Sequence, residues 1–312
     1  MVRQERPVNV LGCARMDPVD HLVRAIDRER HIRVCAAMTT ALVADAARRH
    51  TLTAIATRAV GRALTAGVML ATLTKGEERV TVQLIGDGPI GSITVDASGN
   101  GDVRGYALHP EAGADFGPER LVADVVGRKG ALNVLRDLGL KELYQGQVAL
   151  VTGEVDEDIE AYLRTSEQVP SALACDVLVE GGRVVAAAGV LVQAMPGGEP
   201  DVVREVQHSL RTGLLGELLG EGVRSAKTIA ERTWTLGPLE FVGGERSMRF
   251  QCRCSPERIA EMLALLGTVD LDEMIAEDKP AEVVCNYCST RYQVHRPELE
   301  KIRARVAPRE SN

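Results

Sequence analysis

The chain has 312 residues, which exceeds one ordinary domain and fits two unequal ones. Hydrophobic residues make up 45% of it but aromatic residues only 3%, so a core must consist mainly of Val, Leu, Ile and Ala. The net charge of −7 argues against a nucleic-acid-binding protein, which normally carries a surplus of basic residues.

Residues 1–18 lack a periodic pattern, and we expect them to form an N-terminal arm. The arm begins with charged residues and no apolar segment follows, so we expect no secretory signal. The apolar run 63–74 is too short to cross a bilayer and is interpreted as part of a buried helix, so we expect no membrane association. Seven cysteines without an export signal indicate reduced thiols and a cytoplasmic protein.

Residues 19–196 are expected to form a core domain of the α+β class, an antiparallel sheet with helices beside it. Thr39 or Thr40 is the expected cap of a first helix and Thr51 of a second, which Gly76 ends. The expected strands are 31–38, 80–84, 93–95, 103–108, 147–152, 174–179 and 183–193, and the expected helices are 41–50, 52–75 and 156–166.

One glycine pattern in this domain resembles a dinucleotide-binding motif. Gly86, Gly88 and Gly91 match the spacing GxGxxG after a strand. The motif requires a helix to follow, because the free N–H groups of the helix hold the pyrophosphate. Here Pro89 and the β-branched run 93–95 predict another strand, so we interpret the glycines as a hairpin turn and expect no nucleotide cofactor.

Residues 197–245 are expected to form a helical linker. They follow the segment Pro-Gly-Gly-Glu-Pro at 196–200, the clearest boundary signal in the chain. The linker carries apolar residues at helical spacing and four glycines, each of which costs helix stability of about 1 kcal/mol relative to Ala. These apolar residues are Val203, Val206, Leu210, Leu214, Leu215, Leu218 and Leu219, and the glycines are 213, 216, 220 and 222. Such a helix depends on packing against its neighbours.

Residues 246–312 are expected to form a small zinc domain around four cysteines. Cys252 and Cys254 form a CxC pair, and Cys285 and Cys288 form a CxxC pair after a spacer of 30 residues. Alternation along a strand would place the first two sulfurs on one face, and a tight turn would present the other two. Four thiolates suit one tetrahedral Zn²⁺ ion. His295 is a weaker candidate ligand.

The residues around the cysteines predict a compact unit that depends on metal. Ser255 and Pro256 start a helix whose expected apolar stripe is Ile259, Met262, Leu263 and Leu266. Asp270 and Glu273 resemble a capping box for a second helix, and Pro297 opens a third. This apolar set is too small to hold some 65 residues, so bound zinc, which contributes about 10–16 kcal/mol at structural sites, must supply much of the stability.

The charge around the cysteines argues against a zinc finger that binds nucleic acid. Residues 256–284 contain eight acidic residues and only Arg258 and Lys279 as basic ones, a combination that repels phosphate. A disulfide within the CxC pair would close a small, strained ring, and strained disulfides are the labile, regulatory kind. Zinc-bound thiolates are also open to oxidation, so the site can report oxidants. A purely structural zinc site remains an alternative.

At these cysteines the chain resembles the redox-regulated heat-shock chaperones of about 33 kilodaltons found in bacteria. The resemblance extends over nearly the whole chain. Its other motifs are VQLIGDGP at 82–89, RGYA at 104–107, Tyr162 with SEQVP at 166–170, GVLVQAMP at 189–196 and AED at 276–278. The arm with Cys13 is longer than the family pattern, and we assign it no role.

The resemblance implies a non-enzymatic chaperone that works without ATP. In that family pattern the reduced, zinc-bound protein is inactive. Oxidation would pair Cys252 with Cys254 and Cys285 with Cys288, release zinc and loosen the zinc domain and linker. The exposed apolar surface would then bind unfolding client proteins, and the oxidised form would tend to be a homodimer.

Two other functions remain open from the residues alone. A thiol-disulfide oxidoreductase could use the CxxC pair, although such enzymes place it at a helix N-terminus after a strand. A zinc-dependent adaptor could bind one specific protein. Cys13, Cys35 and Cys175 are interpreted as isolated thiols, and Arg253 and Arg291 as surface residues with at most a minor electrostatic effect on the thiolates.

Overall fold

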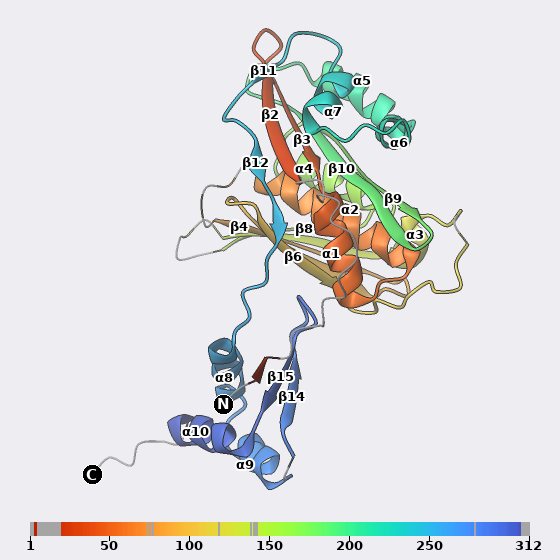
Figure 1. The fold of residues 1–312 in the computed structure, drawn as a ribbon. Helices are drawn as coiled ribbons and strands as arrows, with labels where there is room; N and C mark the ends of the chain where they lie inside the picture. The colour runs from red at the N-terminus through yellow and green to blue at the C-terminus, as the bar shows by residue number, and fades with distance from the viewer. Residues whose placement is uncertain are drawn as a thin grey trace. The chain divides into compact units, whose positions relative to one another are not determined.

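The computed structural model describes residues 3–4 and 20–306, except 73, 75, 77, 118, 138, 140–142 and 278. The described residues form two compact units, one within Arg15–Gln251 and one that combines residues of Cys252–Asn312 with the start of the chain. Helices accompany almost entirely antiparallel sheets, which confirms the α+β class (Figure 1).

The first sheet of the larger unit has six strands in the order β11-β2-β3-β10-β9, with β12 also paired to β2. Its strands are β2 (His21–Asp27), β3 (Ile32–Met38), β9 (Ser171–Glu180), β10 (Arg183–Ala194), β11 (Glu240–Phe241) and β12 (Arg246–Ser247). Gly181 and Gly182 both have positive φ in the β9–β10 turn, as a tight hairpin requires. The sequence missed β2, because polar Arg24 and acidic Asp27 interrupt its apolar pattern.

The second sheet has the order β13-β6-β5-β4-β7-β8. Its strands are β4 (Arg79–Gly86), β5 (Ser92–Ser98), β6 (Asp102–Ala107), β7 (Gly130–Asp137), β8 (Tyr144–Ala149) and β13 (Arg249–Phe250). The predicted strands β4, β5 and β6 are confirmed, whereas β7 was missed and β8 begins before the predicted residue 147. The segment 246–250, which the sequence assigns to the zinc domain, pairs here with β2 and β6.

Four helices complete this core: α1 (Thr40–His50), α2 (Ala54–Ala71), α3 (Val122–Val126) and α4 (Val155–Thr165). Helix α2 contacts strands of both sheets. A Cβ atom at Gly61 would lie 2.8 Å from a methyl group of Val177, and one at Gly67 would lie 2.8 Å from a methyl group of Val95. These two glycines therefore allow the close approach of α2 to β9 and β5.

The cap predicted for α2 is wrong by two residues. The hydroxyl of Thr53 accepts the N–H of Ala56, so Thr53 is the N-cap, whereas Thr51 ends α1 in a left-handed conformation. The helix ends at Ala71 and not at Gly76. Among the described residues α2 alone is long and apolar enough to cross a membrane, but 83% of it is buried, which confirms the interpretation as a core helix.

The glycine motif forms the predicted turn, and strand β5 follows it. The backbone of α3 packs directly on this turn, and a Cβ atom at Gly88 would lie 2.4 Å from the carbonyl oxygen of Val125. The carboxylate of Asp87 accepts the backbone N–H groups of Arg128 and Lys129. The glycines are therefore required by a close approach of two backbone segments.

The predicted linker forms three helices that pack on the first sheet, shown in teal in Figure 1. They are α5 (Pro200–Arg211), α6 (Leu214–Gly220) and α7 (Ala226–Thr233). Gly213 and Gly222 have positive φ and separate the helices, while Gly216 and Gly220 lie inside α6. Most buried residues of the three helices, together with Trp234 directly after α7, form one apolar cluster with the sheet: Val203, Val206, Leu210, Leu215, Leu219, Ala226, Ile229, Ala230 and Trp234.

The smaller unit contains a three-stranded sheet and three helices. The strands, in the order β1-β15-β14, are β1 (Arg3–Gln4), β14 (Ala281–Val284) and β15 (Arg291–Val294). The helices are α8 (Pro256–Ala264), α9 (Thr268–Ala276) and α10 (Arg296–Val306). Within the predicted N-terminal arm the structure describes only Arg3–Gln4, which pair with β15, and Cys13 lies outside the described residues.

Candidate metal centre

Two chain segments bring the four clustered cysteines together. Cys252 and Cys254 lie in an irregular segment between β13 and α8, so the strand predicted for them is wrong. Cys285 and Cys288 lie in the turn between β14 and β15. The side chain of Ser255 accepts the N–H of Arg258 and Pro256 is the first helical residue, as predicted, so α8 starts directly after the first pair.

The CxxC turn is held by backbone hydrogen bonds. The carbonyl oxygen of Cys285 accepts the N–H groups of Cys288 and Ser289, at 3.3 and 2.8 Å. The N–H of Cys285 donates to the carbonyl oxygen of Thr290 at 3.0 Å, which closes the hairpin. Ser289 has a φ of 56°, the left-handed conformation that returns the chain into β15. Both cysteine side chains are thereby directed to the same side of the turn.

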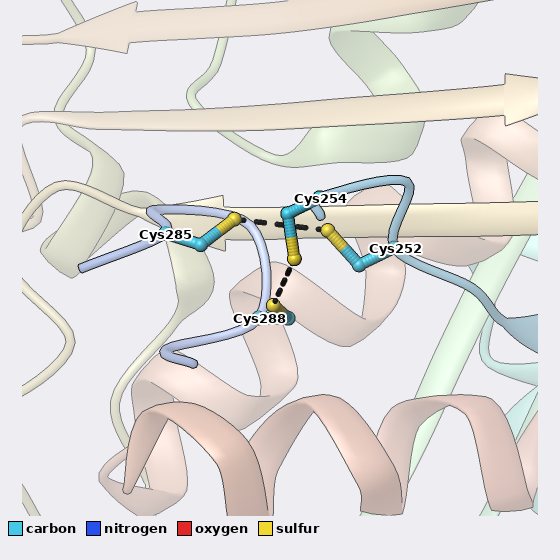
Figure 2. Close-up of side chains that lie close together, drawn as sticks. All are labelled: Cys252, Cys254, Cys285 and Cys288. Carbon is cyan, nitrogen blue, oxygen red and sulfur yellow. Dashed lines mark hydrogen bonds between the residues drawn. The ribbon is translucent and has the colours of Figure 1, made fainter. Parts of the chain in front are cut away.

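The four sulfur atoms converge from these two segments (Figure 2). The Sγ atoms of Cys252 and Cys285 are 3.7 Å apart, and those of Cys254 and Cys288 are 3.4 Å apart. All four sulfurs lie within 4.8 Å of one another. Each of these two distances joins one cysteine of each pair, as expected when four ligands surround a common centre.

The arrangement fits a zinc ion. A Zn–S distance of about 2.3 Å in a tetrahedral site separates neighbouring sulfurs by about 3.8 Å, close to the observed spacing. Four soft sulfur donors without an oxygen donor favour zinc over magnesium or calcium. Three of the cysteines are half-buried and Cys288 is buried, which limits access of water to the centre.

The thiols also alter the acidity of one another. Hydrogen bonds from Cys285 and Cys288 lower the pKa of Cys252, and the same contact with Cys252 raises the pKa of Cys285. Burial raises the pKa of Cys254 to about 11, although a hydrogen bond from Tyr292 acts in the opposite direction. The cluster therefore readily supports one thiolate but opposes further negative charge unless a cation is bound.

Sequence reasoning missed Tyr292 as a residue of the site. Its ring is fully buried, and its hydroxyl group donates a hydrogen bond to the sulfur of Cys254 at 3.0 Å. Its position four residues after Cys288 on β15 gives it this contact. Thr290 also lies beside the cluster, with its hydroxyl 3.2 Å from the sulfur of Cys288. The sequence signal was available, because a tyrosine in a small apolar strand needs a polar partner for its hydroxyl group.

The core that supports the cluster is small. Its buried members are Ile259, Leu263, Leu271, Tyr292, Val294, Leu299 and Ile302. The predicted stripe on α8 is only half right, because Met262 and Leu266 are exposed. The predicted capping box is wrong: α9 begins after Gly267, so Asp270 and Glu273 lie inside the helix. Seven buried side chains agree with the expectation of a unit that needs further stabilisation.

The other candidate residues named above are not members of the cluster. His295 is not among the grouped ligands, and its carbonyl oxygen accepts backbone N–H groups at the start of α10. Arg291 is paired with Glu282 across the hairpin. Cys35 and Cys175 are fully buried, and burial raises the pKa of both thiols, which disfavours the reactive thiolate form.

The position of the CxxC pair separates this site from a thiol oxidoreductase. Such enzymes place the reactive cysteine at the N-terminus of a helix, where the helix dipole stabilises the thiolate. Here Cys285 and Cys288 lie in a hairpin turn followed by β15. The two pairs instead form one shared cluster, a geometry that could hold a metal ion.

Comparison with known proteins identifies the family. The profile of the Hsp33 protein family matches residues 20–295. This chain belongs to the Hsp33 family. A 33 kDa chaperonin of Synechococcus sp. (strain JA-3-3Ab) is 40% identical over 296 residues, which cover 92% of this chain and 91% of the relative. The 33 kDa chaperonin of Geobacillus kaustophilus is 37% identical over 303 residues, which cover 91% of this chain and 97% of the relative.

A solved structure has the same fold. The crystal structure of the 33 kDa chaperonin of Thermotoga maritima, described as a heat shock protein 33 homolog, superimposes with a TM-score of 0.81. It is 30% identical, and the match covers 91% of this chain and 97% of that one. The resemblance inferred from the sequence is therefore confirmed. Hsp33 proteins are non-enzymatic holdase chaperones, and this member carries a cluster of four cysteines that could bind a metal ion.

Proposed function

We propose that this protein is a cytoplasmic, redox-regulated holdase that binds unfolding proteins without ATP and is switched by a zinc site. The observation that carries the proposal is the convergence of Cys252, Cys254, Cys285 and Cys288 to within 4.8 Å. When bound, zinc would hold these sulfurs as thiolates and stabilise the small unit around them. In this form the protein is inactive as a chaperone.

Oxidation by a peroxide converts the four thiolates into two disulfides, Cys252–Cys254 and Cys285–Cys288. In each pair one thiolate attacks a peroxide oxygen, breaks the O–O bond and becomes a sulfenic acid. The second sulfur attacks the sulfenic sulfur and expels the oxygen as water. Each disulfide thus gives two electrons to one peroxide, which takes up two protons and leaves as two waters. Because every disulfide removes two zinc ligands, the unit loses its metal and its main stabilising contribution.

The switch acts on the helices that cover the first sheet. Helices α5, α6 and α7 bury an apolar face of that sheet, so their release would expose a broad apolar surface. Two buried carboxylates hold α5 and the end of α7 in place. Glu160 on α4 accepts hydrogen bonds from Gln207 and Arg211 of α5, and Asp27 accepts the indole N–H of Trp234 directly after α7, at 3.1 Å. We infer that in the oxidised protein α5, α6 and α7 detach from the first sheet, that clients bind the exposed surface, and that the protein forms a homodimer.

The test is suppression of aggregation of a thermally unfolding enzyme by the reduced and by the peroxide-treated protein, with zinc release followed in parallel. We expect activity only after oxidation and about one zinc released per chain. The variant Cys285→Ser/Cys288→Ser should lose this redox dependence, while Cys35→Ala, which alters a buried thiol in β3, should keep it. Equal activity of reduced and oxidised parent protein would refute the redox switch.

A further inference from the structure

The two large sheets differ in how their edges are protected. An exposed strand edge presents unpaired N–H and C=O groups, and folded proteins normally cover or block such groups. In the first sheet, β11, β12 and the residues after each of them pair along β2. In the second sheet, β13 pairs along β6. These two edges are covered by the segment 240–251.

A third edge, that of β9, is blocked by carboxylates. Its outward N–H groups at Leu173, Cys175 and Val177 donate to the side chains of Glu160, Asp156 and Asp176, at 2.6, 3.4 and 2.8 Å. Two of these acceptors lie four residues apart on α4, so one helix face blocks two successive sites of the strand. No further strand can pair here without displacing the acids.

The fourth edge, that of β8, is open in the part of the chain that the structure describes. Leu150 donates its N–H to Gly130 of β7, and the antiparallel register then directs Tyr144, Gly146 and Val148 toward β7. Gln145, Gln147 and Ala149 therefore direct their N–H and C=O groups outward, and none of them has a hydrogen-bond partner among the described residues.

The composition of β8 also lacks the usual protection. Residues 143–153 contain no charged residue and no proline, which are two of the features that prevent pairing at an edge. Large apolar side chains are exposed at both ends of the strand: Leu143 by 57%, Tyr144 by 48% and Val151 by 62%. The edge thus combines unpaired backbone groups with apolar side chains.

We propose that the outer edge of β8 is a docking strand for extended segments of unfolded client polypeptides, which bind by adding a strand to the second sheet. The inference rests on the proposed holdase function. Unfolded clients share little sequence, but all of them offer backbone N–H and C=O groups, and an uncharged strand accepts these irrespective of side-chain charge. The exposed apolar residues at the two ends then contact apolar side chains of the client.

The same surface is poorly suited to a stable pairing with a second copy. On the exposed face of β8 the side chains are those of Gln145, Gln147 and Ala149, which provide neither an apolar stripe nor opposite charges for a partner strand. A contact along a strand of six residues also buries far less surface than the about 1,200 Å² that stable interfaces bury. A weak contact of this size suits a client that is also held at other surfaces of the chaperone.

Amide hydrogen exchange of the full-length oxidised protein tests the proposal. The probe is reduced, carboxymethylated α-lactalbumin, which stays unfolded, and fluorescence anisotropy confirms its binding. We expect the amides of Gln145, Gln147 and Ala149 to exchange at least tenfold more slowly with the client bound. The amides of Gly146 and Val148 should be protected in both samples, because they already bond to β7.

Three results would overturn the proposal in distinguishable ways. If the client binds and the three outward amides exchange at unchanged rates, the edge is not the docking site, although the holdase function stands. Protection that appears without client and grows with protein concentration assigns the edge to a second copy. If the oxidised chain binds no client at all, the proposed function itself fails and the docking strand with it.

A pair of variants at Gln147 provides an independent test of client binding at the edge of β8. Gln147→Pro removes one outward N–H without touching the β7 ladder, whereas Gln147→Thr keeps that N–H and the strand preference. Loss of one backbone hydrogen bond should weaken client binding by about two- to twelvefold for the proline variant only. Melting temperature and zinc content of the reduced variants show whether both fold, and equal client affinities of two folded variants would contradict the docking strand.

Discussion

If release of α5–α7 gates activation, two glycine-to-alanine changes in the same linker should act in opposite directions. An added Cβ atom meets nothing within 4 Å at Gly220 or at Gly213, so neither change creates a clash. The backbone conformations differ. Gly220 is the last residue of α6, and its φ is negative. Gly213 has a φ of 99°, a conformation that L-residues rarely adopt.

The backbone conformation sets the sign and size of each effect. Ala at a compatible helical position stabilises by about 0.4–1 kcal/mol, so Gly220→Ala should favour the docked linker about two- to fivefold. Ala in a left-handed conformation costs about 1–2 kcal/mol, so Gly213→Ala should favour release by about five- to thirtyfold. Gly222, with a φ of 87° and open space around its Cβ position, provides a second variant of the destabilising kind.

The assay is the temperature at which peroxide-treated protein reaches half of its maximal suppression of client aggregation. We expect Gly220→Ala to raise this temperature and Gly213→Ala to lower it, with hydrogen exchange in α6 slowed in the first and accelerated in the second. Zinc content of the reduced variants should match the parent protein, because the changes lie outside the cysteine unit. Shifts in the same direction, or unchanged activation in both variants, would refute the linker as the gate.

Three further outcomes follow from the cysteine site. The reduced protein should hold one zinc, and Cys285→Ser/Cys288→Ser should abolish it and unfold the small unit, as metal analysis and circular dichroism would show. Along an oxidant titration the Cys285–Cys288 disulfide should form before Cys252–Cys254, because the backbone hydrogen bond of 3.3 Å from Cys288 to Cys285 already closes its turn. Mass spectrometry that finds the Cys252–Cys254 disulfide first, or disulfides that join one pair to the other, would contradict this order. Tyr292→Phe removes the hydrogen bond to Cys254 and should accelerate zinc loss to a chelator by about two- to twelvefold, whereas an unchanged rate would show that this bond does not hold the site.

The sequence by itself determined which four cysteines come together and the class of the fold. The spacing of the two cysteine pairs identified the cluster, because two cysteines one or two residues apart can direct both sulfurs to one point. Alternating apolar residues identified β4, β5 and β6, and Gly181 with Gly182 identified the β9–β10 hairpin. These features depend on neighbours along the chain, which a sequence displays directly.

Only the tertiary structure decided what depends on distant partners. Strand β2 has a mixed pattern and is fixed by pairing with β3 and with the segment 240–248. The contact of Tyr292 with Cys254 spans 38 positions, and the bond from Gln207 to Glu160 spans 47. The same holds for the sheet edges: the acids that block β9 and the open edge of β8 become visible only once the strands are placed in order, because the sequence of a strand does not record what lies beside it.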